Sequence, residues 1–96
     1  MLIARVIGTT VSTIKDEKLS GKKLLILCQT DERGVLTGKP YVAIDTVDAG
    51  IGDLVLTAAG SSARQTNITK DTPVDAVIMA VIDHLEVNGE ITFTKS

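Results

Sequence analysis

Residues Leu2 to Thr13 read Leu-Ile-Ala-Arg-Val-Ile-Gly-Thr-Thr-Val-Ser-Thr, and they govern the fold. The stretch is rich in Ile, Val and Thr and lacks a helical stripe of apolar residues, so it predicts a long first β-strand. Gly8 inside it predicts a bend or bulge, which a closed barrel needs. Next along the chain, Lys23 to Thr30 predicts a second strand, whose apolar middle is typical of a strand covered on both faces.

The rest of the chain also favours strands. The Asp31–Gly34 turn, extended by polar residues through Pro40, predicts a hairpin loop, and Asn88-Gly89 predicts a tight hairpin. One or two short helical turns are expected, at residues 60–65 and 73–76, with a surface loop between them. The four further strands are expected at Tyr41–Val47, Asp53–Ala58, Val77–Val87 and Glu90–Thr94.

Together these elements indicate one mostly β domain over residues 1–96, a small five-stranded closed barrel similar to the oligonucleotide-binding fold. A two-layer sandwich is the alternative. The barrel is favoured because the long first and fifth strands can each bend and pair with several partners.

Composition weighs against several classes of function. Tyr41 and Phe93 are the only aromatic residues and the net charge is −2, whereas single-stranded nucleic acids bind to exposed aromatics in a positive groove. We therefore expect no nucleic-acid partner. No run approaches the about 20 apolar residues of a membrane span, and the first residues lack the order of a signal peptide. These features predict a cytoplasmic protein without a membrane partner.

Possible catalytic side chains lack their partners. Ser61 and Ser62 follow Gly60, but the second glycine of a nucleophile elbow is missing. His84 is the only histidine, with no second ligand at metal-binding spacing. Cys28 is the only cysteine and lies in an apolar run, which is typical of a buried thiol. We expect no catalytic site.

Cofactor and metal motifs are also incomplete. Gly50-Ile51-Gly52 follows a predicted strand, but the third glycine of a dinucleotide fingerprint would stand where Val55 is. The spacing of Asp45, Asp48 and Asp53 matches no calcium loop, so turn-forming acids are favoured over a cation site. The sequence predicts no cofactor and no metal.

The segment from Asp45 to Arg64 is unusually dense in small residues. Small side chains let backbones approach closely, either in a tight turn within the barrel or where subunits converge around the axis of a ring. Arg64, the one long cation of the segment, could pair with a carboxylate of an adjacent chain.

At this segment the chain resembles the vertex proteins of bacterial microcompartment shells, the EutN/CcmL type. The resemblance runs from about Met1 to Phe93. The matching pieces, in order, are Ala4–Gly8, Val11–Thr13, Leu19–Leu25, Val42–Val47, Ala49–Gly52, Val55-Leu56, Gly60–Arg64, Pro73–Ala76 and Val81–Asp83.

The resemblance implies a homopentamer that caps the five-fold vertices of a shell otherwise tiled by hexameric shell proteins, with enzymes enclosed as further possible partners. A small ligand-binding or nucleic-acid-binding barrel is the alternative function. The resemblance implies glycine at two positions where this chain differs, usually at Asp48 and often at Ala80. In a pentamer, Asp48 would bring five extra carboxylates near the ring axis, and these would repel one another. The residues expected at the subunit interface or pore are Asp45, Asp48, Ala49, Gly50, Gly52, Gly60, Ser61, Ser62, Ala63, Arg64 and Asp83.

Overall fold

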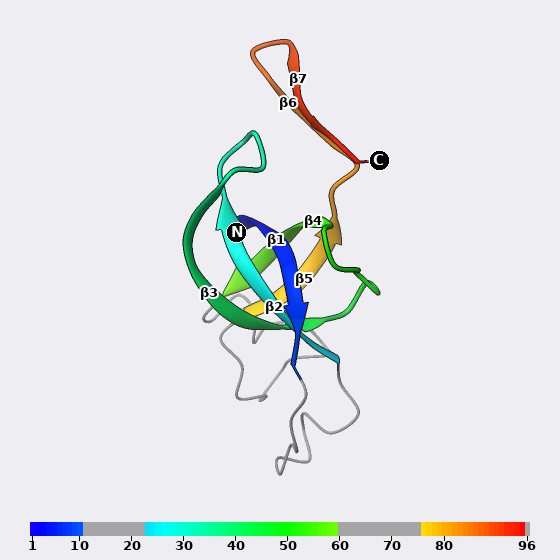
Figure 1. Ribbon diagram of the computed structural model, residues 1–96. Helices are drawn as coiled ribbons and strands as arrows, with labels where there is room; N and C mark the ends of the chain where they lie inside the picture. The colour runs from blue at the N-terminus through cyan, green and yellow to red at the C-terminus, as the bar shows by residue number, and fades with distance from the viewer. Residues whose placement is uncertain (11–22, 60–75, 96) are drawn as a thin grey trace.

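A computed structural model describes residues 1–10, 23–59 and 76–95 of the chain, and it shows a closed five-stranded β-barrel with a separate two-stranded hairpin (Figure 1). The predicted barrel is thus confirmed, and the sandwich is not what forms. Around the barrel the strands follow the order β1-β2-β3-β5-β4. The strands are β1 (Leu2–Thr9), β2 (Lys23–Thr30), β3 (Leu36–Asp45), β4 (Leu54–Ala59), β5 (Ala76–Val81), β6 (His84–Val87) and β7 (Glu90–Thr94).

Two pairings close the barrel. The first strand pairs antiparallel with both β2 and β4, so β1 joins the two ends of the sheet. On the far side, β3 and β5 form a short parallel contact at Ile44 and Val77. The register of β1 against β2 shifts between Val6 and Gly8. This bulge is the predicted irregularity at Gly8, and it bends the strand.

Side chains that point alternately inward and outward along the strands fill the barrel interior. Apolar residues that are almost fully buried point inward from every strand of the barrel, and each buried Leu or Ile contributes about 1.5–3 kcal/mol. Alanines are frequent among them, because a barrel of only five strands leaves little interior volume. The interior cluster comprises Ala4, Val6, Leu25, Leu27, Ala43, Ala49, Val55, Ala76 and Ile78.

The sequence misplaced the start of the third strand. Residues 36–40, expected to be part of a hairpin loop, are the first half of β3 and pair with β2. This half of β3 pairs with β2 alone, and its side chains are exposed to solvent. Because no second strand pairs with it on the other side, Pro40 can stand here without a backbone N–H and no hydrogen bond between strands is lost. Exposure on both faces hid the strand from an analysis of apolar pattern.

The expected long strand Val77–Val87 is also wrong, because it is two strands. The chain leaves the barrel at Ile82 and Asp83, between β5 and β6. Ile82 is buried and its N–H donates to the Leu54 carbonyl, which ends β5 against β4. Both expected helical turns fall on residues outside the described ranges, apart from Ala76, which begins β5.

The hairpin β6–β7 projects from one end of the barrel (Figure 1). Its turn is the predicted Asn88-Gly89, and both residues have positive φ, 53° and 81°, as a two-residue hairpin turn requires. In the described parts of the chain, no helix is long and apolar enough to cross a membrane.

Candidate subunit-interface site

The loop between β3 and β4, residues 46–53, carries four of the expected interface residues, and Asp45 enters it from the end of β3. The Asp45 side chain is 1% exposed. Its carboxylate accepts hydrogen bonds from the backbone N–H of Val47 at 3.0 Å and of Ala49 at 2.9 Å. Asp45 therefore shapes the loop from within the subunit, and Ala49 is buried beneath the loop.

Lys23 reaches the same loop from the start of β2. Its Nζ lies 3.5 Å from Asp45 Oδ2 and 3.4 Å from Asp48 Oδ1, and it donates to the Ala49 carbonyl at 3.1 Å. The ammonium thus offsets part of the negative charge that two aspartates bring to one loop. Sequence reasoning missed Lys23, because only the β2–β3 register, which pairs it with Asp45, places it there.

Asp48 occupies a backbone position that suits glycine. Asp48 has φ 56°, in the left-handed region where aspartate is tolerated and glycine is unstrained. Its side chain is 97% exposed. Ala80, the other position at which the resemblance leads one to expect glycine, has no positive φ and pairs with Leu56 beside a register shift between β4 and β5.

A second aspartate closes the far end of the loop. The Gly50 N–H donates to Asp53 Oδ2 at 2.9 Å, and the Asp53 N–H donates to the Gly50 carbonyl at 3.1 Å. Gly52 follows with φ 94° and open space around it, and Ile51 between the glycines is 69% exposed. Asp45 and Asp53 are therefore turn-forming acids, as the sequence predicted.

Arg5 ties this loop to two other segments. Its Nη1 donates to the Gly52 carbonyl at 2.9 Å and its Nη2 to the Gly34 carbonyl at 3.3 Å. The guanidinium also lies 5.8 Å from the centre of the Phe93 ring, within range of a cation–π interaction. The signal in the sequence for this role is a lone cation within an apolar strand, and that signal does not identify the partners of the guanidinium.

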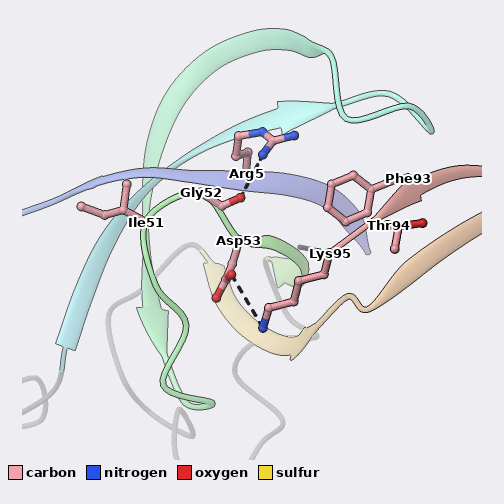
Figure 2. A pocket seen from close by; sticks show the side chains of 7 residues that line it. All are labelled: Arg5, Ile51, Gly52, Asp53, Phe93, Thr94 and Lys95. Carbon is pink, nitrogen blue, oxygen red and sulfur yellow. Dashed lines mark hydrogen bonds and ion pairs between the residues drawn. The ribbon is translucent and has the colours of Figure 1, made fainter.

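These contacts border a pocket between the 51–53 loop and the base of the hairpin (Figure 2). Lys95 crosses it, with its Nζ 3.8 Å from Asp53 Oδ1. The Lys95 N–H donates to the carbonyl of Asp83 at 2.7 Å, so the expected interface residue Asp83 lies at the base of the hairpin and is linked to the loop through Lys95. The lining residues are Arg5, Ile51, Gly52, Asp53, Phe93, Thr94 and Lys95.

The expected interface residues Gly60 to Arg64 lie outside the described ranges. Two other side chains that the sequence analysis considered lie away from the pocket. His84 is exposed on β6, and Cys28 is buried with its Sγ 3.1 Å from the Gly38 carbonyl oxygen. Among the residues that the structure describes, no group of three or more His, Cys, Asp or Glu side chains is arranged to hold a metal ion.

The described residues thus form a small barrel with a braced loop that contains Gly50 and Gly52. Comparison with known proteins gives its family. A family model described as "Ethanolamine utilisation protein EutN/carboxysome" matches residues 1–83. The chain belongs to the EutN/CcmL family.

Individual relatives cover nearly all of the chain. The carboxysome shell vertex protein CcmL of a Nostoc species is 46% identical over 96 residues, spanning 99% of this chain and 95% of the relative. Its solved structure gives a TM-score of 0.91 and covers 99% of this chain and all of that one. GrpN of Rhodospirillum rubrum, described as a pentameric microcompartment shell protein, gives a TM-score of 0.81 at 41% identity and covers 91% of this chain and 99% of its own.

Proposed function

We propose that this chain is a structural protein whose pentamers cap the five-fold vertices of a bacterial microcompartment shell in the cytoplasm. One observation carries the proposal. The backbone follows shell vertex proteins over nearly its whole length, and GrpN, one of the similar structures, is described as a pentameric shell protein. A flat hexagonal layer closes only where five-fold units introduce curvature, so the function is geometric.

The loop over residues 46–53 suits a subunit interface in this proposal. Its backbone is braced by Asp45, Asp53, Lys23 and Arg5 before any partner arrives, so little conformational entropy is lost on association. Gly50 and Gly52 present backbone without side chains, which permits close approach. The small residues Gly60 to Ala63 are proposed to belong to the same interface, and Arg64 to pair with a carboxylate of an adjacent chain.

The charge balance of the loop also suits a ring. Five copies of Asp48 around an axis would repel one another, but each carries Lys23 at 3.4 Å in its own subunit. Asp48 is therefore compatible with a position near the axis. The pentamer would meet hexameric shell proteins at its rim, with enzymes enclosed by the shell.

A non-catalytic role is part of the same proposal. The described carboxylates of Asp45 and Asp53 are occupied by backbone amides, and the Cys28 thiol is buried. The similar proteins are named as shell vertex proteins.

The test is shell closure. Hexamer-forming shell proteins from the same genome would be expressed with and without this chain and examined by electron microscopy. We expect closed polyhedra with the chain and open or elongated shells without it. Ser62→Trp should abolish closure while the circular dichroism of the barrel is retained, and Ser62→Ala should close normally. Closed shells formed equally well without the chain would contradict the proposed function.

A further inference from the structure

Among the described residues, the contacts that hold the β6–β7 hairpin to its own barrel lie near its base. Thr92 Oγ1 donates to the Glu32 carbonyl, Phe93 lies against Arg5, and Lys95 pairs with Asp53. None of these contacts involves the tip, residues 86–91. A two-stranded ribbon is marginally stable alone in water, so this tip is a candidate for support from another molecule.

The tip has the surface of a docking element. Ile91 is 64% exposed and Val87 is also exposed. Glu86 and Glu90 stand beside them, exposed, and neither forms an ion pair with any described residue. The hairpin lies beyond residues 1–83, which the family model matches, and the alignment with the Nostoc CcmL structure extends over it.

The pocket at the base of the hairpin has the complementary character. Its lining includes two cations, Arg5 and Lys95, and one carboxylate, that of Asp53 (Figure 2). Its apolar surface comes from Ile51, which is exposed, and from Phe93, which is half-buried. An acidic, apolar tip therefore matches a basic, apolar pocket in charge and in polarity.

The tip does not fill the pocket of its own chain. Ile91 precedes Thr94, which lines the pocket, by three residues on one extended strand, a separation of about 10 Å along β7. A ring is built from heterologous contacts, in which one surface of each subunit meets a different surface of the next. Tip and pocket are such a pair of different surfaces on one chain.

We infer that the tip of the β6–β7 hairpin docks into the Arg5–Lys95 pocket of the neighbouring copy in the ring, with Ile91 against Ile51 and Glu86, which pairs with Ile91 on the same face of the hairpin, toward the two cations. This inference rests on the proposed pentamer. The hairpin contact would adjoin the interface proposed for the loop over residues 46–53, because Ile51 belongs both to that loop and to the pocket.

Disulfide cross-linking tests the contact. In the full chain, Ile91→Cys and Ile51→Cys would be combined, and oxidation under native conditions should give covalent chains of up to five subunits on a denaturing gel. Mixing and reassembling the two single variants should give cross-linked pairs, which shows that the bond joins different copies. The matched control combines Ile91→Cys with Val42→Cys, an exposed apolar position on β3 away from the pocket, and should stay uncross-linked.

A second variant tests the charges without cysteine chemistry. Glu86→Lys with Glu90→Lys should raise the concentration at which the pentamer dissociates by about tenfold at low salt, and Glu32→Lys should not. Native mass spectrometry of the same samples separates the two claims. A pentamer that neither cross-links at 51 and 91 nor responds to the charge reversal overturns the hairpin contact and leaves the proposed function standing. Absence of a pentamer from the unsubstituted protein contradicts the proposed function itself.

Discussion

Replacing Asp45 with alanine should destabilise the protein more than any other single change in the 45–53 loop. The carboxylate is 1% exposed and holds two backbone amides, those of Val47 and Ala49, at 3.0 and 2.9 Å. No other described side chain accepts from these amides, so the substitution leaves both without their partner.

The magnitude follows from these two bonds. A hydrogen bond to a charged acceptor contributes about 1.5–3 kcal/mol, and the two are not fully additive, so we expect Asp45→Ala to cost about 3 kcal/mol. The Lys23 contact adds little, because that ammonium is half exposed. Asp45→Asn keeps one acceptor oxygen and should cost about half as much. For a domain of this size, 3 kcal/mol lowers the melting temperature by roughly 12–24 °C.

The assay is thermal unfolding at one fixed protein concentration, because subunit association shifts apparent stability. Amide hydrogen exchange at Val47 and Ala49 should show the loss of protection directly. Asp48→Asn is the matched control, since Asp48 is 97% exposed and asparagine tolerates its positive φ; it should change stability by less than about 0.5 kcal/mol. If Asp45→Ala were as mild as this control, the assignment of Asp45 as the brace of the loop would be wrong.

Three further changes follow from single features. Asp48→Gly should leave the fold intact and raise its stability by up to about 1 kcal/mol in denaturant unfolding, because glycine relieves the left-handed backbone; a clear loss would contradict that reading. Tyr41→Phe should cost about 1 kcal/mol, since the Tyr41 hydroxyl and Thr57 Oγ1 lie 3.2 Å apart inside the barrel, and an unchanged melting temperature would refute the contribution. The backbone N–H of Val35, followed by that of Arg33, lowers the pKa of Asp31 below its ordinary 3.8. The ionised carboxylate therefore stabilises the fold above the unfolded pKa, and the advantage over Asp31→Asn should disappear as pH falls through the folded value; an NMR titration midpoint at or above 3.8 would contradict this.

The strands that could be predicted are those whose apolar pattern matches their burial. Lys23–Thr30 was located to the residue, because its continuous apolar middle, Leu24 to Cys28, is buried or partly buried throughout. The first half of β3 escaped, because five consecutive exposed residues carry no inward pattern. The break at Ile82 and Asp83 escaped for the opposite reason, since apolar residues continue from β5 into the hairpin while the backbone turns away from the barrel.

The sequence singled out part of the candidate site by its composition and did not reveal the contacts that brace it. The density of small residues marked the segment from Asp45 to Arg64, which contains the loop over residues 46–53, and the resemblance predicts a place at the subunit interface for it. The side chains that brace it from outside, Lys23 and Arg5, come from strands distant in the sequence. Only the register of β1 and β2 brings them to the loop, and no local pattern encodes that register.

Native mass spectrometry of the purified, unsubstituted chain tests the central claim most directly. Five copies of a 10.1 kDa chain give an assembly of about 50 kDa, and we expect that species to dominate at micromolar concentration. A monomer, dimer or hexamer as the main species under the same conditions would contradict the assignment of this protein to the five-fold vertices of a shell.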